Sequence, residues 1–155
     1  MSPEVRAFLD AAGVPYRTHP HAPLVSFEDA KVILPFDPGS MVKGLVFRTP
    51  SGAFAIVALR GADRADYKKI ADALGVRRAD LRAADPADVE AELGMQLGGV
   101  VPLPINGAVV LIDQAVASLG TVYCGSGRNE VTLELKAQDL LRTADGRVGI
   151  YAKLA

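Results

Sequence analysis

The sequence lacks the features of disulfide-bonded and membrane-spanning proteins. It has a single cysteine, Cys124, which cannot form a disulfide within the chain and therefore fits a reducing compartment. No apolar run approaches the roughly 20 residues that a transmembrane helix needs. The first residues carry charges and have no apolar segment of the kind found in signal peptides. We therefore expect a cytoplasmic protein without a membrane partner.

The chain also lacks a strong excess of charge. It contains 17 Lys and Arg against 18 Asp and Glu, so its net charge is −1 and no DNA partner is expected. One local excess, which we call the basic segment, runs from Arg60 to Arg82. Its seven basic residues are Arg60, Arg64, Lys68, Lys69, Arg77, Arg78 and Arg82, and its four acids are Asp63, Asp66, Asp72 and Asp80. The basic segment is either a solvated surface or a local contact for RNA phosphates.

Most familiar catalytic and metal-binding motifs are absent. The sequence has no Gly-x-x-x-x-Gly-Lys-Ser/Thr loop, no His-Glu-x-x-His and no nucleophile elbow. His19 and His21 lie two residues apart without a cysteine pair, so we predict a surface histidine pair rather than a zinc site. Cys124 has no cationic cluster near it in sequence, which favours a packed thiol over a nucleophile. No metal or cofactor is expected.

The composition is that of a folded domain. Half of the residues are apolar, so the chain can form one domain, residues 1–155, around a hydrophobic core. Hydrophobic periodicity and capping residues predict helices at 3–12, 27–33, 66–74, 89–93 and 137–141. Strands are expected at 14–18, 42–48, 53–59, 108–112, 121–124, 131–135 and 148–153. Because this order has no regular βαβ rhythm, we predict an α/β fold with a mixed, mostly antiparallel, barrel-like sheet flanked by short helices.

Lys43 stands out because its neighbours are apolar. It lies near the start of the strand Val42-Lys43-Gly44-Leu45-Val46-Phe47, which otherwise looks core-bound. A lysine near a core needs a partner, a route to solvent or a function, because an isolated buried ammonium is costly. At a strand end the side chain could also extend outward into solvent. Lys43 is therefore a candidate functional residue with a structural alternative.

Three further segments could contribute to a site. Gly98 and Gly99 precede two valines and Pro102, so this loop could direct amide N–H groups at a carbonyl oxygen, or it could be a simple turn. Asp113 ends an apolar strand and is either a turn former or a buried partner for a cation or for backbone amides. The turn at 125–128 could line a cleft, although a purely structural turn is the default interpretation.

In this order, the segments resemble the YbaK-type family of aminoacyl-tRNA deacylases, whose domain also occurs as the editing insertion of bacterial prolyl-tRNA synthetases. The segments that carry the resemblance are Ser26-Phe27-Glu28-Asp29-Ala30, Val42-Lys43-Gly44-Leu45-Val46-Phe47, residues 66–75, Gly98-Gly99-Val100-Val101-Pro102, Leu111-Ile112-Asp113 and Cys124-Gly125-Ser126-Gly127. The resemblance extends from about Pro15 to the C-terminus. The order and spacing of these segments, rather than any one motif, make the resemblance specific.

The resemblance implies a mixed α/β fold with a central barrel-like sheet, and it assigns roles to individual residues. It implies that Lys43 is the functional lysine and Asp113 an acid near the pocket. The implied substrate loop comprises Gly98, Gly99, Val100, Val101 and Pro102. The implied pocket wall includes Ser126, Gly127 and His19. Two residues depart from the family pattern, since Gly44 and Val101 stand where hydroxyl residues are common, and both departures bear on the amino acid accepted.

The resemblance also implies a reaction, the hydrolysis of the ester in misacylated tRNA. We expect a freestanding trans-editing enzyme in which amides around Gly99 and Val100 stabilise an oxyanion, while Lys43 holds the terminal phosphate or ribose or adds positive charge at the reaction centre. Water assisted by the neighbouring ribose hydroxyl is the expected nucleophile. The expected substrate is a small amino acid such as alanine, serine or cysteine on the tRNA acceptor end, with tRNA-Pro and a prolyl-tRNA synthetase as candidate partners. The alternatives are a non-catalytic tRNA-binding or synthetase-binding module and a small-molecule hydrolase or binding protein.

Overall fold

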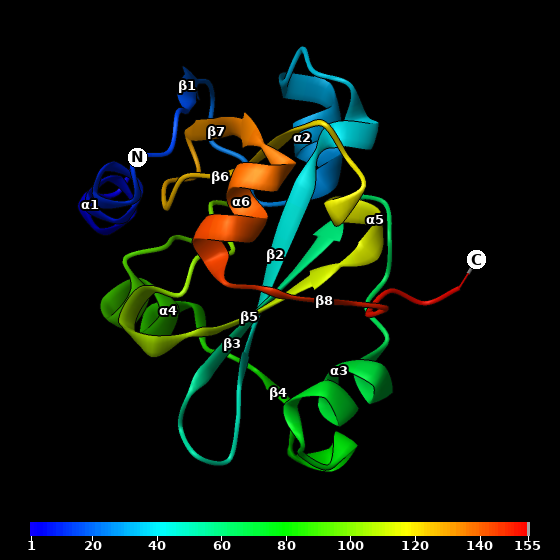
Figure 1. The fold of residues 1–155 in the computed structure, drawn as a ribbon. Helices are drawn as coiled ribbons and strands as arrows, with labels where there is room; N and C mark the ends of the chain where they lie inside the picture. The colour runs from blue at the N-terminus through cyan, green and yellow to red at the C-terminus, as the bar shows by residue number, and fades with distance from the viewer. Residues whose placement is uncertain (155) are drawn as a thin grey trace.

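The fold consists of two sheets and a set of short helices (Figure 1), seen in a computed structural model that describes residues 1–154. The strands are β1 Arg17–Pro20, β2 Val42–Arg48, β3 Phe54–Arg60, β4 Arg82–Ala83, β5 Val109–Asp113, β6 Thr121–Gly125, β7 Val131–Lys136 and β8 Arg147–Gly149. The α-helices are α1 Pro3–Ala12, α2 Phe27–Ile33, α3 Tyr67–Leu74, α4 Pro86–Leu93, α5 Gln114–Ala117 and α6 Ala137–Ala144. Short 3₁₀ turns lie at Pro38–Ser40, Arg78–Asp80 and Ile105–Gly107.

The larger sheet has the strand order β4-β2-β3-β5-β8. Strand β2 is antiparallel to both β3 and β4, whereas β3 pairs with β5, and β5 with β8, in parallel. In the central strand β3, every residue from Phe54 to Leu59 is buried. Such a continuous apolar run is typical of a strand that is covered on both faces.

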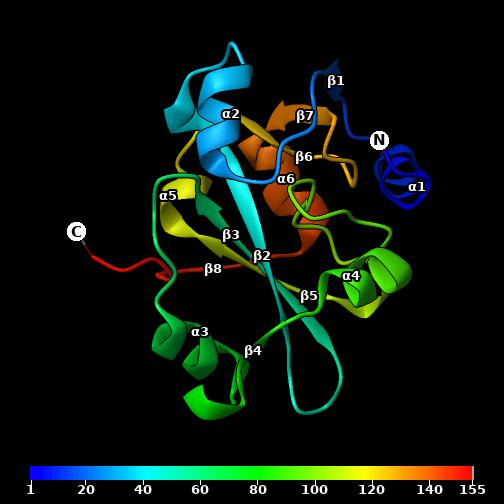
Figure 2. The same cartoon turned by 180° about the vertical axis from the view of Figure 1, so that it is seen from behind.

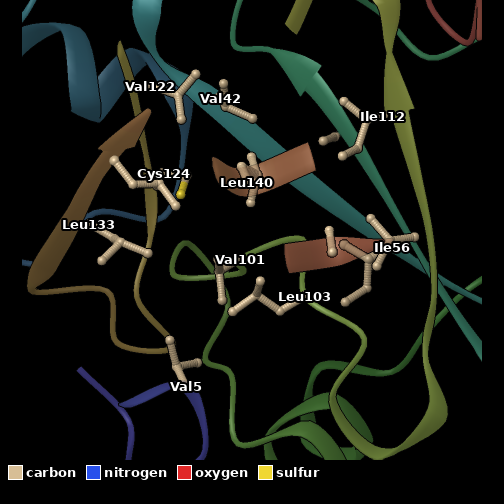
Figure 3. Close-up of a cluster of buried hydrophobic side chains, with 14 of the residues drawn as sticks. Val5, Val42, Ile56, Val101, Leu103, Ile112, Val122, Cys124, Leu133 and Leu140 are labelled. Atoms are coloured by element: carbon tan, nitrogen blue, oxygen red, sulfur yellow. The ribbon is translucent and has the colours of Figure 1, made fainter. Parts of the chain in front are cut away.

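The two faces of β3 contribute to two separate cores. Ile56 and Ala58 belong to the larger core, which lies between the sheets and includes Leu140 of α6. Figure 3 shows side chains from both sheets and from α6 converging there. Val57 and Leu59 point to the other side, where α3 covers the sheet with Ile70. Because successive side chains of a strand point to opposite faces of the sheet, one apolar run contributes to two cores.

The smaller sheet has the order β1-β7-β6 and is antiparallel throughout. Its Val122, Cys124 and Leu133 face the larger core. The two sheets approach each other where β6 runs beside the start of β2, and a single parallel bridge joins Met41 to Tyr123. The sheets are therefore adjacent but do not close into a barrel, which corrects the barrel-like part of the expected fold.

Local capping chemistry explains the helix boundaries. The side chains of Ser2, Ser26, Asp66 and Asp85 each accept a hydrogen bond from an amide in the first turn of the following helix. Helices α1, α3 and α4 each end at a glycine in the left-handed conformation. Most elements therefore lie where the sequence predicts them.

Several elements differ from the prediction: α4 begins earlier, at Pro86, α6 extends further, to Ala144, and β4 was not expected. The strand expected at 148–153 is Arg147–Gly149, and beyond it only Ala152 forms a bridge, to Ala65. The first strand lies at Arg17–Pro20, because it pairs with β7 and therefore depends on a partner distant in sequence. Helix α5 was not expected, since its four residues are too few to show helical periodicity. Among residues 1–154, none of the helices has the length and apolar character to cross a bilayer.

Candidate functional site

A cleft with a volume of about 270 Å³ lies between the start of β2, the end of β6, the segment around α2 and the loop at 97–100. Figures 1 and 2 show α2 beside the beginning of β2 from opposite directions. The lining of the cleft is mostly apolar and includes Leu24, Phe27, Leu34, Met41, Leu45 and Val100. Lys43 and the backbone of Gly98 also line it. The cleft therefore brings together the lysine and one glycine of the loop that the sequence singles out.

The amine of Lys43 is held by two main-chain carbonyls at the edge of the cleft. Its Nζ donates to the carbonyl oxygen of Gly61 at 3.1 Å and to that of Asp63 at 2.5 Å. Burial lowers the pKa of Lys43 below its usual value, which the negative charge of Asp63 partly opposes and the positive charge of Arg64 reinforces. An ammonium has three N–H donors, so one remains for a ligand. Lys43 thus does not extend freely into solvent, and among residues 1–154 it forms no ion pair.

Phe27 contributes to the burial of this amine. A Cβ at Gly61 would collide with the Phe27 ring, so the ring packs directly on the backbone whose carbonyl holds Lys43. Glycine at position 61 therefore allows α2 to close over the lysine.

The loop that follows α4 forms a tight turn. The amide of Gly99 donates to the carbonyl of Gln96 at 2.9 Å, and Gly98 between them has a φ of +82°. A positive φ in the third position is the requirement of a type II turn, which glycine meets without strain. A Cβ at Gly98 would also collide with the carbonyl oxygen of Leu24. Gly98 is therefore required for both the turn and the packing.

The turn determines which amide N–H groups of this loop are engaged in hydrogen bonds. The Gly99 amide is occupied by Gln96, and the Gly99 carbonyl accepts from Gly127 at 2.7 Å. Gly99 does not line the cleft, which means that the expected oxyanion donor at this residue is already engaged. Gly98 and Val100 do line the cleft, and within residues 1–154 no hydrogen bond involves their amides. These two amides are the candidate donors.

The loop is joined to the turn between β6 and β7 by reciprocal hydrogen bonds. Gln96 donates its amide to the carbonyl of Gly127 at 2.8 Å, while its side-chain oxygen accepts from the Asn129 amide at 3.1 Å. A Cβ at Gly125 would collide with the backbone of Gly99, so these segments pack main chain against main chain. This close approach explains the glycines in both segments.

Val100 and Val101 have different environments. Val100 lines the cleft, and its Cγ1 lies only 2.7 Å from the position that a Cβ at Gly44 would occupy. Val101 is fully buried in the larger core and Pro102 is also buried, and neither lines the cleft. Of the two departures from the family pattern, only Gly44 therefore adjoins the cleft.

Ser126 and Gly127 follow the lining residue Gly125 and make structural contacts outside the cleft. Ser126 is fully buried, and its hydroxyl donates to the Val131 carbonyl at 2.7 Å. Gly127 has a φ of +89°, and a Cβ there would collide with the Ser2 hydroxyl. The structure places neither residue in the lining, which instead contains Gly125.

Asp113 lies outside the cleft. Its side chain is 3% exposed and caps α5 by accepting from the Ala115 amide at 3.0 Å. It also accepts from the amides of Tyr151 and Ala152 at 2.8 and 3.1 Å. Of its two expected roles, the structure therefore supports a buried partner for backbone amides, and this role ties the C-terminal segment to β5.

The two histidines lie next to the cleft. His19 contacts Glu134 at 2.9 Å and packs edge-on against Phe36, which in turn stacks on Tyr123 with ring centroids 4.0 Å apart. Tyr123 lines the cleft but His19 does not. His21 contacts the Thr132 hydroxyl at 2.7 Å, so each histidine has a polar partner rather than being a free surface ring.

Sequence reasoning missed several lining residues. Tyr123 and Thr132 lie on short strands, where no motif distinguishes them from ordinary sheet residues. The segment Ser26–Ala30 contributes to the resemblance and to a predicted helix, but the sequence does not identify it as a wall of the cleft. Cys124 lines the cleft as a buried thiol, and burial raises its pKa to about 12, which agrees with a packed side chain rather than a nucleophile.

The basic segment is partly neutralised by its own acids. Arg60 pairs with Asp63 at 3.0 Å, and Arg77 pairs with Asp80 at 2.8 Å. Arg78 lies over the Tyr67 ring at 4.6 Å from its centroid. Within residues 1–154, ion pairs at Arg64, Lys68, Lys69 and Arg82 are absent. These four side chains are the ones most available to phosphates.

The cleft brings an amine and unbonded loop amides around a small apolar space, and these donors can bind a carbonyl or phosphate oxygen. The model of the aminoacyl-tRNA editing domain matches residues 21–143, and the chain belongs to this family. The fold is similar to that of a hypothetical protein, APE2540, with a TM-score of 0.83, 24% identity and coverage of 97% of this chain and 99% of the other. It is also similar to a candidate trans-editing enzyme for prolyl-tRNA synthetase, with a TM-score of 0.81, 23% identity and coverage of 99% of both chains.

Proposed function

We propose that the protein is a freestanding trans-editing hydrolase that cleaves the ester between a small amino acid and the 3′ end of tRNA. The observation that carries this proposal is that Lys43 and the unbonded amides of Gly98 and Val100 line one cleft in a chain of the aminoacyl-tRNA editing family. The structural neighbour described as a candidate trans-editing enzyme for prolyl-tRNA synthetase supports action in trans.

Each group in the cleft would have a separate role in the reaction. The Lys43 ammonium, with two N–H groups held by carbonyls, would direct its third towards a phosphate or ribose oxygen of the terminal nucleotide. The amides of Gly98 and Val100 would stabilise the oxyanion that forms when water attacks the ester carbonyl. The neighbouring ribose hydroxyl would assist the water, and the ester bond would break to release the amino acid and tRNA.

The size of the cleft favours a small side chain such as that of alanine, serine or cysteine. Val100 projects into the space that a side chain at position 44 would need, and the walls from α2 are bulky and apolar. A hydrophobic pocket separates substrates that differ by one methylene by roughly 1–3 kcal/mol. Such selectivity is enough to exclude a larger cognate amino acid from hydrolysis.

The tRNA acceptor end is the proposed partner, with Arg64, Lys68, Lys69 and Arg82 as candidate phosphate contacts and a prolyl-tRNA synthetase as a candidate cellular partner. If these side chains contact phosphates, raising the salt concentration weakens substrate affinity. An affinity that does not respond to salt excludes the basic segment from the interface. A cytoplasmic location is the setting in which such a substrate would be encountered.

Deacylation of a panel of misacylated tRNAs tests the proposal. We expect the purified protein to hydrolyse at least one tRNA charged with a small amino acid, and Lys43→Met to reduce the rate by at least about tenfold. Lys31→Met, a lysine on α2 that forms an ion pair with Glu28, is the matched control and should keep the rate of the parent. Equal rates for Lys43→Met and the parent would refute the role of Lys43.

The same panel separates the alternatives. Binding of tRNA without hydrolysis of any ester would identify a non-catalytic module. Hydrolysis of free aminoacyl esters at the rate found for full tRNA would identify a small-molecule hydrolase, because it would show that the RNA contributes nothing to recognition.

A further inference from the structure

A hydroxyl on the wall of the cleft is bound by a histidine that lies outside it. Thr132 on β7 lines the cleft and is 4% exposed, and its Oγ1 lies 2.7 Å from Nε2 of His21. The other ring nitrogen, Nδ1, lies 2.7 Å from the carbonyl oxygen of Ala22. Both nitrogens of His21 are therefore engaged, one of them with a residue of the cleft.

These contacts fix the direction of the hydrogen bond to Thr132. A carbonyl oxygen only accepts, so Nδ1 of His21 must carry the proton that it donates to Ala22. In the neutral ring, Nε2 then has no proton and accepts the hydroxyl proton of Thr132. The oxygen of Thr132 is left with lone pairs but no free proton, so it can only accept a further hydrogen bond.

Strand geometry places Thr132 on the same face of the hairpin as Gly125. Leu133 and Leu135, the odd-numbered neighbours in β7, belong to the larger core, so Thr132 belongs to the opposite face. Gly125 pairs with Thr132 across the hairpin and also lines the cleft. The absence of a side chain at position 125 leaves the Thr132 oxygen uncovered from that strand.

Thr132 differs from the other two hydroxyls that line the cleft within residues 1–154. Ser26 is exposed, and its oxygen accepts from the Asp29 amide as the cap of α2. Tyr123 is partly exposed and stacks on Phe36. Thr132 alone among the three is buried, and its oxygen, which donates to His21, keeps lone pairs for a further donor. A ligand that donates a hydrogen bond there gains this interaction, whereas an apolar group does not.

We propose that Thr132 contacts the ligand as a hydrogen-bond acceptor, that His21 is the positioning residue that makes it an acceptor, and that the cleft thereby selects an acyl group with a hydrogen-bond donor. The donor is either the α-ammonium of an aminoacyl group or a hydroxyl on its side chain. This inference rests on the proposed function, because it takes the ligand to be the aminoacyl end of tRNA. The inference assigns the selection of the acyl group to Thr132 on β7 and not to the bulky residues of α2.

Three stable analogues of the acylated 3′ end distinguish these donors. Each is 3′-amino-3′-deoxyadenosine joined by an amide to an alanyl, a propionyl or a 3-hydroxypropionyl group. The alanyl group carries the ammonium, the 3-hydroxypropionyl group carries only a hydroxyl, and the propionyl group carries neither. Dissociation constants are measured by calorimetry at pH 7.5, where most histidine side chains are neutral.

For the parent protein we expect the alanyl or the 3-hydroxypropionyl analogue to bind about tenfold more tightly than the propionyl analogue, the effect of one hydrogen bond to a buried acceptor. The analogue that shows the preference identifies the donor. In Thr132→Val, which keeps the shape but removes the acceptor, the preference should vanish, so that the three analogues bind with similar affinities. Thr132→Ser, which keeps the hydroxyl, should retain the preference.

The variants of His21 test its positioning role. His21→Ala should lower the preference without weakening the propionyl analogue, whereas a merely structural role would weaken all three equally. His21→Gln should restore the preference, because the glutamine side-chain oxygen can take the place of Nε2 as acceptor.

A preference that persists in Thr132→Val, or one that His21→Ala leaves unchanged, overturns the inference. It is also overturned if none of the three analogues binds the parent. Deacylation of intact tRNA is then measured separately. Hydrolysis without selection by Thr132 refutes the inference but leaves the proposed function standing. If no tRNA is hydrolysed, both the proposed function and the inference are refuted.

Discussion

The Cγ1 atom of Val100 lies 2.7 Å from the position that a Cβ at Gly44 would occupy. The two residues come from different sides of the cleft, one from the loop after α4 and one from β2, and both line it. A side chain at either position therefore limits the other. The pair sets the width of the cleft beside Lys43, which is the next residue to Gly44 in the chain.

Gly44→Ala should lower stability by about 1–3 kcal/mol, because the added methyl group overpacks against Val100. The double variant with Val100→Ala should recover part of that loss, since the shorter side chain vacates the space. Urea unfolding of the two single variants and the double variant measures the coupling between the positions. Strictly additive changes would show that the two residues do not compete for the same volume.

Gly98→Ala should destabilise the protein more than Gly52→Ala. Both glycines have a positive φ, of +82° and +87°, so alanine pays a backbone penalty of about 1–2 kcal/mol at either position. Only at Gly98 does the new methyl group also collide, with the Leu24 carbonyl, because the space around Gly52 is open. Urea unfolding of both variants tests this difference. Equal losses would mean that the loop moves away from Leu24 without cost.

Asp113→Ala should destabilise the fold by about 2–4 kcal/mol, because three amides lose their acceptor, two of them at Tyr151 and Ala152. Asp85→Ala is the matched control, since it removes an exposed cap and should cost only about 1 kcal/mol. We expect the folded fraction of Asp113→Ala to keep its affinity for the acylated analogues. A weakened affinity in fully folded protein would place Asp113 in ligand binding after all.

Cys124 should react slowly with iodoacetamide in the native protein. Burial raises its pKa to about 12 from the usual 9.0, so at pH 8 the thiolate is about a thousandfold rarer than in an exposed cysteine. Modification in 8 M urea serves as the reference for full accessibility. Native labelling at a similar rate would mean that the wall of the cleft opens often.

The elements that could be predicted from sequence are those with local signals. Ser2 and Pro3 begin α1 and Gly13 ends it, so nearby residues are sufficient to define that helix. The extent of β1 depends on its pairing with β7, and the two are separated by more than a hundred residues. The two sheets meet at a bridge between Met41 and Tyr123, and no local pattern in the sequence reveals that contact.

The candidate site also combines residues that the sequence identifies with contacts that only the fold reveals. Lys43 could be singled out because a charged residue within an apolar strand is anomalous wherever the strand lies. The engagement of Gly99 by Gln96 could not be inferred, because the sequence of a glycine-rich loop does not state which of its amides face inward. Thr132 became a candidate only when the fold placed it beside His21, a residue 111 positions away in the chain.

The hydrogen bonds that join Gln96 and Gly99 to the turn at Gly127 have a mechanical consequence. They make the loop and the β6–β7 hairpin a single rigid wall, so a ligand cannot widen the cleft by displacing one without the other. The opposite wall, from Leu24 through α2, rests on a small apolar cluster of its own. We therefore expect any adjustment to a bulkier acyl group to come from α2, whose Phe27 ring packs on the Gly61 backbone that holds Lys43.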